Sequence, residues 1–265
     1  MQTRRLHSSE SLSLLNLGNL FSLWESVGTA NGSLEIHDGF RRIYHHGSSW
    51  PNRLWLTEGQ GLGSARAALR EARGHLTERD RPVLLALTEE QAAACGDWLA
   101  AEGFSPAFSQ TAMALDLKER SDTPAEGDLE LRKVITPDEA SRWARCASEA
   151  FGYAVDPVVV RNAAASPGIT FCLGYLSDEV AGTGLLCTHR GVAGFHMAGT
   201  RPRYRRRGVA RQMLHHLLRK ARRAELEYGT LQASAMGEAL YLQLGFRKQF
   251  GLRNYLFSDP RPEYA

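Results

Sequence analysis

The stretch Arg205-Arg206-Arg207-Gly208-Val209-Ala210 decides the fold, because it stands between a strand pattern and a helix pattern. The run Gly194–Gly199 before it has the character of a strand. After it, Val209, Met213 and Leu217 repeat at the spacing of a helix that packs on a sheet. The first amide groups of a helix lack internal partners, and the helix dipole is positive at that end. The sequence therefore predicts a turn that binds an anion.

The residues of this turn suit a pyrophosphate. Gly208 lets the backbone approach a ligand closely, and Ala210 keeps the second position small. Three successive arginines add positive charge. Residues 201–224 hold ten Lys and Arg and no acid, but the cations later in the helix suit a solvated face near its C-terminus. Only the turn is therefore expected to contact the ligand.

Elements of both kinds alternate around the turn, which predicts a mixed α/β protein. Thr136-Pro137-Asp138-Glu139 is typical of a helix start, with Thr as N-cap and Pro at the first helical position. In the second half we expect strands at 129–134, 169–176, 179–188, 194–199, 228–233 and 254–257, and helices at 137–150, 161–165, 208–224 and 237–244. In the first half we expect strands at 33–36, 40–45 and 82–87, and helices at 12–27, 66–76 and 89–101.

The pattern Arg205-x-x-Gly208-x-Ala210 resembles the Q/R-x-x-G-x-G/A signature of the GNAT superfamily of acyl-CoA-dependent N-acetyltransferases. Pro202 precedes it, and 231–235 and 239–246 follow at the distance of that family's next strand and helix. The resemblance covers about residues 128–258. It implies a GNAT fold with a mixed α/β (α+β) sheet.

The resemblance also implies which residues bind acetyl-CoA and which act on it. The backbone of Met197, Ala198 and Gly199 would pair with the pantetheine arm. Ser234 would contact the cofactor, and Tyr241 would protonate or hydrogen-bond the departing thiolate. The pyrophosphate would lie on the turn and the first helical turn, with contacts from Arg205, Arg206, Arg207, Gly208, Val209, Ala210 and Arg211.

Other roles near the thioester have two readings each. His196 is a candidate to deprotonate the amine, directly or through water, or else a satisfied core histidine. No Asp or Glu lies in residues 191–200, where many relatives place a base. Phe151 and Tyr153 follow the first helix of the domain, where they either line the acceptor pocket or belong to the core.

The reaction that this implies moves an acetyl group from acetyl-CoA to a primary amine by direct attack, without a covalent enzyme intermediate. An alternative is a non-catalytic acyl-CoA sensor or regulatory module, which the missing acidic base favours and Tyr241 disfavours. A third hypothesis is nucleic-acid binding through the basic block, which predicts a strongly salt-dependent affinity. We expect no nucleic-acid or membrane partner, and the acceptor amine stays open.

The chain is long enough for two domains. We expect a first domain at 1–120, a linker at 121–127, a catalytic domain at 128–258 and a tail at 259–265. The helix, glycine and phenylalanine around Gly103-Phe104 recur at Gly245-Phe246, 142 residues later, which indicates an internal duplication. The first copy lacks the arginine signature, has at most a faint relic of it at 60–63, and carries Leu99 where Tyr241 would align. We therefore expect that copy to be degenerate and catalytically silent, or an accessory domain.

Composition limits the remaining possibilities. The cysteines Cys95, Cys146, Cys172 and Cys187 are far apart, so we expect free thiols in a cytoplasmic protein. No metal is expected, because the adjacent pairs His45-His46 and His215-His216 point in different directions. No signal peptide or run of about 18 apolar residues is present. The expected state is a monomer or homodimer.

Overall fold

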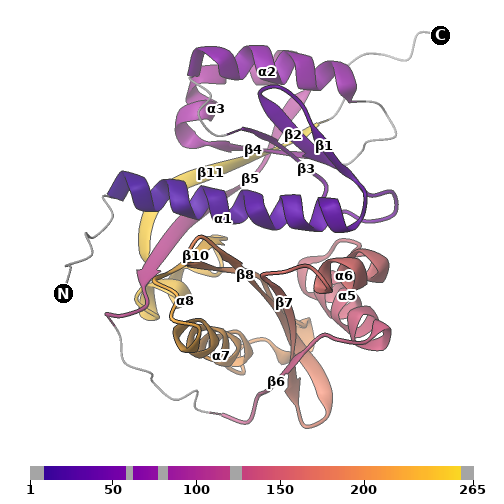
Figure 1. Cartoon of the computed structure of the whole chain (residues 1–265), viewed down its shortest axis with the longest axis vertical. Helices are drawn as coiled ribbons and strands as arrows, with labels where there is room; N and C mark the ends of the chain where they lie inside the picture. The colour runs from indigo at the N-terminus through magenta and orange to yellow at the C-terminus, as the bar shows by residue number, and fades with distance from the viewer. Residues whose placement is uncertain (1–8, 58–61, 77–82, 120–126, 258–265) are drawn as a thin grey trace.

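The computed structural model describes residues 9–57, 62–76, 83–119 and 127–257 (Figure 1). The predicted linker 121–127 lies outside the described residues except for Gly127, and the predicted tail 259–265 lies outside them altogether. Residues 60 and 61 of the faint relic, and Pro82 of a predicted strand, also lie outside them.

Each half of the chain contributes helices and strands in a similar order. The first half contains α1 (Ser9–Ala30), β1 (Leu34–Ile36), β2 (Phe40–Ile43), β3 (Arg53–Leu56), α2 (Leu62–His75), β4 (Leu84–Thr88), α3 (Glu89–Cys95), α4 (Trp98–Ala101) and β5 (Phe104–Asp116). The second contains β6 (Glu130–Lys133), α5 (Pro137–Phe151), α6 (Pro157–Ala164), β7 (Ile169–Leu176), β8 (Glu179–His189), β9 (Val192–Thr200), the 3-10 turn η2 (Pro202–Tyr204), α7 (Val209–Arg223), β10 (Tyr228–Ala233), α8 (Glu238–Gln243) and β11 (Arg247–Phe257).

Two helices show why the sequence folds as it does locally. Helix α5 begins as predicted: the Thr136 side chain accepts from the Glu139 amide, and the Glu139 side chain accepts from the Thr136 amide. Helix α7 begins after Gly208, also as predicted. Its stripe of Val209, Met213 and Leu217 is buried against the sheet, and this burial fixes the helix that carries the predicted anion turn.

The described strands form one sheet in the order β1-β2-β3-β4-β11-β5-β10-β9-β8-β7-β6. The two halves exchange their last strands across its centre. Strand β5 of the first half pairs with β10 of the second, while β11 of the second half pairs with β4 of the first. The exchanged strands β5 and β11 pair with each other, so the sheet is continuous through the molecule (Figure 1).

The pairing is symmetric about the β5–β11 ladder. Strands β3 and β4 pair in parallel, as do β9 and β10, and each pair is followed by the exchanged antiparallel strand. The β5–β11 ladder is interrupted twice, by one extra residue at Ala107 and one at Gln249. These bulges are 142 residues apart, the same offset at which the two copies align in sequence. The two halves thus repeat one supersecondary plan.

Helix α1 lies between the two halves in Figure 1 and packs on the centre of the sheet against β5, β8, β9 and β10. Its Asn16 and Asn19 side chains are fully buried. Asn16 Nδ2 donates to the Met113 carbonyl at 3.1 Å, and Asn19 Nδ2 donates to the Cys187 carbonyl at 3.0 Å. An element of the first half is therefore bonded to strands of both halves.

The structure differs from the sequence predictions in several elements. The helix predicted at 89–101 is two helices, α3 and α4, separated at Gly96 and Asp97. Three further differences have a clear physical cause. The strand β3 at 53–56 was not predicted, because four residues are too short for a clear alternation. The last strand begins at Arg247 rather than at residue 254, because its polar first part pairs with β5 along the backbone. Helix α6 begins at Pro157 rather than at residue 161, because the Asp156 carboxylate accepts from the Val158 amide at 2.7 Å.

Candidate active site

Strands β9 and β10 part in the middle of the sheet. They pair in parallel at only three positions, the last being Gly194 with Thr230. On its other side β9 stays paired with β8, except at a bulge where Met197 and Ala198 face the single residue Gly184. Met197 has a φ of +49°, and Thr183 Oγ1 donates to its carbonyl at 3.0 Å. The β9 edge beyond Gly194 is therefore open to an extended ligand.

The predicted anion turn lies at the end of this opened strand. Gly208 caps α7 with a φ of +75°, a conformation that favours glycine, and no side chain caps the helix. Arg206 also has a positive φ, +60°. The first helical hydrogen bond runs from the Gln212 amide to the Gly208 carbonyl at 3.0 Å. The amides of Val209, Ala210 and Arg211 are thus free of helical partners.

Ion pairs hold the start of the turn in place. Arg201 binds both oxygens of Glu149 on α5, with its Nε at 2.6 Å and its Nη2 at 2.8 Å. This pairing lowers the pKa of the Glu149 carboxyl and raises that of Arg201. Arg203 lies 3.0 Å from Glu179, which also accepts from the Tyr204 hydroxyl. These contacts anchor the turn to α5 and β8.

The three arginines of the signature therefore differ in their surroundings. Arg205 Nη2 donates to the Ala150 carbonyl at the end of α5, at 3.0 Å. The Arg207 guanidinium lies 5.6 Å from the centre of the Tyr204 ring. Within the described part of the chain, neither Arg206 nor Arg207 forms an ion pair with a carboxylate. These two exposed cations remain for a ligand at the start of α7.

Tyr241 on α8 has a raised pKa of about 12, because its phenol is desolvated by burial. Its ring packs edge-on against Phe246, with the ring centres 6.0 Å apart. Its hydroxyl makes no hydrogen bond to another described residue. A Cβ at Gly237 would lie 3.0 Å from the Tyr241 ring and 3.6 Å from Ser234 Oγ, so these two predicted site residues flank the same glycine. The phenol is protonated at neutral pH.

His196 is buried on the face of the sheet that α1 covers. Its Nε2 lies 3.1 Å from Asn19 Oδ1, and burial lowers its pKa to about 4. The ring is therefore neutral at pH 7. Gly194 provides the space for this pair, since a Cβ there would lie 1.8 Å from Asn19 Oδ1 and 2.4 Å from His196 Nε2.

Phe151 and Tyr153 lie against β9 beside the bulge. Their rings stack with centres 5.7 Å apart and planes 16° apart. The Tyr153 hydroxyl donates to Met197 Sδ at 3.8 Å, and the Phe151 ring lies 3.0 Å from where a Cβ at Gly199 would stand. The structure thus brings both aromatic residues to the strand that carries the opened edge, on the side opposite α7.

Sequence reasoning missed Asn19, Thr183 and Arg53 near this site. Asn16 and Asn19 carried a signal, because two asparagines three residues apart interrupt an otherwise apolar helix and so indicate buried polar contacts. Arg53 begins β3, the strand that was not predicted. No sequence pattern links it to Tyr153, although the two groups influence each other's pKa.

No helix among the described residues is long and apolar enough to span a membrane. The fold is a mixed α/β sheet with a strand edge open to an extended ligand. Residues 167–248 match the family model described as an acetyltransferase (GNAT) domain. The chain therefore carries a GNAT acetyltransferase domain over these residues, and members of this family normally use an acyl-CoA as co-substrate.

Solved structures share the fold over most of the chain. A GCN5-related N-acetyltransferase from Kribbella flavida has a TM-score of 0.64 and 16% identity, covering 91% of this chain and 96% of its own. One from Sphaerobacter thermophilus has a TM-score of 0.60 and 17% identity, covering 84% and 78%. A tandem GNAT protein from the clavulanic acid biosynthesis pathway has a TM-score of 0.55 and 17% identity, covering 84% and 79%. No curated protein matches the chain.

Proposed function

We propose that this protein transfers an acetyl group from acetyl-CoA to a primary amine. The observation that carries the proposal is the strand edge that opens beyond Gly194, because it leads directly to the uncapped start of α7. A thioester with an extended arm and an anionic group at its other end would fit the open edge of β9 and the start of α7. The protonated phenol of Tyr241 supplies an acid within the same half of the molecule.

In this proposal acetyl-CoA binds along β9. Its pantetheine arm would pair with the backbone of 197–199, and its pyrophosphate would bind the amides at the start of α7. Arg206 and Arg207 would add charge-assisted contacts, because no described acid occupies them. The anchored Arg201 and Arg203 would hold the turn in shape rather than contact the ligand.

The proposed reaction is direct aminolysis of the thioester. The neutral amine nitrogen forms a bond to the carbonyl carbon, and the carbonyl oxygen gains negative charge that backbone N–H groups stabilise. The carbon–sulfur bond then breaks with its electrons on sulfur. The Tyr241 hydroxyl gives that thiolate a proton or hydrogen bond, and the amine nitrogen loses a proton to complete the amide.

The proton acceptor in this scheme is water, with His196 as the remaining side-chain candidate. A pKa of about 4 makes His196 a weak base at neutral pH, and Asn19 already occupies its Nε2. Both facts favour a role in orienting the amine or a bound water. We keep Phe151 and Tyr153 as the acceptor side of the site, because they lie against the bulge.

We propose that the first half is catalytically silent, within the predicted boundaries 1–120 and 128–258. In support, Leu99 stands 142 residues before Tyr241 and is buried, so that half has no phenol at the matching place. The four cysteines are buried and unpaired, which supports a reducing compartment such as the cytoplasm. The proposed state is a monomer or homodimer.

A second candidate is a sensor that binds acyl-CoA without turnover. The absence of any Asp or Glu in residues 191–200 favours it, since no strong base lies on β9. A panel of polyamines, aminoglycosides, amino acids and peptides with free N-termini, each incubated with acetyl-CoA and assayed for free thiol, separates the two. We expect thiol release with at least one amine. Tight acetyl-CoA binding with no release above the hydrolysis background would support the sensor instead.

A further inference from the structure

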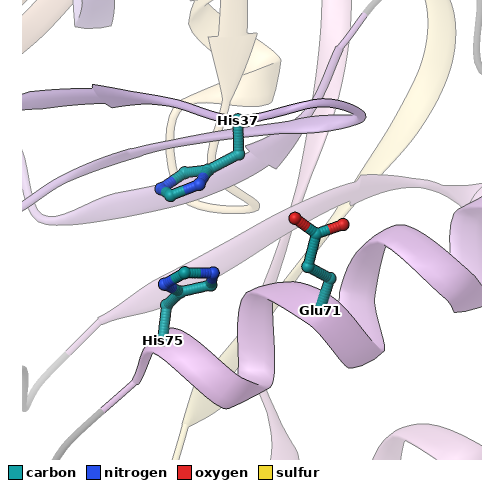
Figure 2. Close-up of side chains that lie close together, drawn as sticks. All are labelled: His37, Glu71 and His75. Carbon is teal, nitrogen blue, oxygen red and sulfur yellow. The ribbon is translucent and has the colours of Figure 1, made fainter.

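Two histidines and a glutamate meet at the outer edge of the first half (Figure 2). His37 lies in the turn between β1 and β2, and Glu71 and His75 lie in the last turns of α2. Each offers a ligand atom, and these three atoms all lie within 4.8 Å of one another. The cluster is remote from the Tyr241 half of the sheet and plays no part in the proposed acyl transfer.

The backbone brings the three side chains to one point. Glu71 and His75 are four residues apart, so they project from the same face of α2. The His37 ring stacks on Phe40 with centres 4.3 Å apart and planes 9° apart, which fixes its orientation. The His37 and His75 ring centres are 4.5 Å apart. In Figure 2 the Glu71 carboxylate points toward the space beside both rings.

A series of polar contacts from neighbouring residues holds the two histidines of the cluster in position. His37 Nε2 lies 3.5 Å from Glu35 Oε2, which leaves Nδ1 for another partner. Arg42 binds the two oxygens of Glu35 through its Nη2 at 2.7 and 2.8 Å. Arg42 Nη1 also donates to the His75 carbonyl at 3.0 Å. One arginine therefore fastens the strand that carries Glu35 to the end of the helix that carries His75.

We propose that His37, Glu71 and His75 bind a divalent transition-metal ion, with Zn²⁺ as the best fit. Two imidazoles and a carboxylate are ligands that Zn²⁺ accepts, with bonds of about 2.0–2.2 Å and water at the fourth position. The carboxylate behind His37 matches the outer contact that metal-bound histidines usually make. Glu71 and His75 are exposed, so their side chains are free to close on the ion.

This proposal departs from the expectation of no metal, which rested on the adjacent histidine pairs and on the four dispersed cysteines. Its ligands come from a turn and a helix that are separated by β2 and β3 in the chain. No short sequence motif therefore contains all three residues, and the site could not be predicted from the sequence. The ion would clasp the β1–β2 hairpin, at the free edge of the sheet, to the C-terminal end of α2. Its positive charge would also suit the negative end of the helix dipole.

The test is calorimetric titration of the full chain with ZnCl₂ after treatment with EDTA and dialysis. We expect one ion per chain and a melting temperature that rises with Zn²⁺. Glu71→Gln and His75→Gln should each weaken binding by about tenfold or more and remove the shift in melting temperature. His46→Gln and Glu90→Gln, which remove the same groups elsewhere, should bind as the parent does.

No binding by the parent protein, or equal binding by the parent, Glu71→Gln and His75→Gln, would overturn the proposal. Both variants change exposed side chains, so they should fold, and circular dichroism without metal verifies this. Substitution by Co²⁺ gives a second readout, because its visible spectrum reports a tetrahedral site. Loss of that spectrum in His37→Gln but not in His46→Gln would identify the same ligands.

A different observation concerns the acceptor, and it rests on the proposed acyl transfer. Arg53 Nη1 donates to the Asn52 carbonyl at 2.9 Å, and its guanidinium lies 5.9 Å from the Trp24 ring. No carboxylate among the described residues pairs with it. The segment before Arg53 contacts the segment that carries Tyr153, because the Ser49 amide donates to the Ala154 carbonyl at 2.8 Å. The Tyr153 hydroxyl in turn contacts Met197 at the β9 bulge. An arginine of the first half without a carboxylate partner among the described residues therefore lies close to the segment that carries these aromatic residues.

We infer that Arg53 binds a carboxylate carried by the acceptor amine. The test offers each amine of a panel as a free carboxylate and as its carboxamide. The parent should prefer the carboxylates through a lower KM, and Arg53→Met should lose that preference by about tenfold or more, while the control Arg161→Met keeps it. Arg53→Met should melt no lower than the parent, because an unpaired charge leaves its partly buried position.

A preference that survives in Arg53→Met, or its absence in the parent, would overturn this assignment while leaving the acyl transfer intact. A drop in melting temperature that accompanies the loss of preference would point to a structural role instead. A different result would contradict the proposed acyl transfer itself: no amine, as carboxylate or as carboxamide, would cause release of thiol from acetyl-CoA.

Discussion

The two halves of the molecule differ at the last position where their parallel strands pair. In each half the two parallel strands pair at three positions. The third position is Trp55 on β3 in the first half and Gly194 on β9 in the second. Trp55 is fully buried and packs with Trp24 of α1, with ring centres 5.2 Å apart. At Gly194 no side chain is present, and the Asn19–His196 pair occupies the space.

This difference shows how two copies of one fold can surround the same element of the sheet with different chemistry, as the proposed division into a working and a silent half requires. In the first half a tryptophan fills the last paired position with apolar surface and packs against α1. In the second half a glycine at the last paired position leaves space for polar groups, and the strand edge beyond it is open. Leu99 and Tyr241, which occupy equivalent positions, also distinguish the two halves. The first half has a buried apolar side chain at this position, and the second half has a phenol.

The sharpest test of this division is Tyr241→Phe. It removes the proton donor and little else, so kcat should fall by about 10²–10⁴-fold while acetyl-CoA still binds. Tyr255→Phe on β11 is the matched control and should keep its kcat. Adding Leu99→Tyr to the Tyr241→Phe variant should restore nothing, because the first half has no opened site. Steady-state thiol release measures all three, and a full-speed Tyr241→Phe enzyme would refute the acid role.

Gly194→Ala tests the space at the point of divergence. The added methyl would lie 1.8 Å from Asn19 Oδ1 and 2.4 Å from His196 Nε2, so the buried pair must separate. We expect a loss of about 3 kcal/mol in the free energy of unfolding, from overpacking and a broken buried hydrogen bond. Gly74→Ala on α2 meets no atom within 4 Å and should gain about 0.5–1 kcal/mol. Urea unfolding compares them, and equal effects would contradict the comparison.

The pH dependence of stability should report His196. Its pKa is about 4 in the folded chain against an ordinary value of 6.5, so between these pH values the unfolded chain binds the proton and the folded chain does not. Stability should therefore fall as pH drops from 6.5 to 4, by up to about 1.4 kcal/mol per pH unit. His196→Gln should flatten this slope, and His46→Gln should keep it. Urea midpoints with the same slope in both variants would exclude His196 as the cause.

The smallest expected effect separates the arginines of the turn before α7 from an arginine at the far end of that helix. Arg206→Ala and Arg207→Ala should each raise the KM for acetyl-CoA by about five- to tenfold, because each removes a charge-assisted contact to phosphate. Arg223→Ala, at the other end of α7, should leave it as it is. The effects should shrink as salt is added. An equal rise in all three would mean that the whole basic block attracts the ligand at long range.

Much of this division was predictable from the sequence. The turn before α7 was predicted from Gly208 and the Val209–Met213–Leu217 stripe, because those residues specify their conformation locally. The start of α5 followed from Thr136 and Pro137 for the same reason. The 142-residue repeat was visible in Gly103-Phe104 and Gly245-Phe246, and the matched bulges now give it a backbone register.

The missed features depend on contacts between distant segments. Strand β3 is four residues long and gains its place from pairing with β2 and β4. The first part of β11 is polar, and it is a strand because β5 supplies its partners. Asn19, Arg53 and the His37 cluster act across segments that only the folded sheet brings together. The sequence shows which polar and charged groups these residues carry, but it does not predict which residues they contact.

The exchange of β5 and β11 has a consequence for how the chain is made. On a ribosome the first half emerges before β10 and β11 exist, so β4 and β5 have no strand to complete their ladders. Their edges stay exposed until nearly the whole second half has been synthesised, and such edges favour pairing with the wrong chain. A stop codon shortly before β11 would therefore remove the partner of β4 in the first half as well as a strand of the second half. Natural selection acting on either half must also preserve the strand that it contributes to the other.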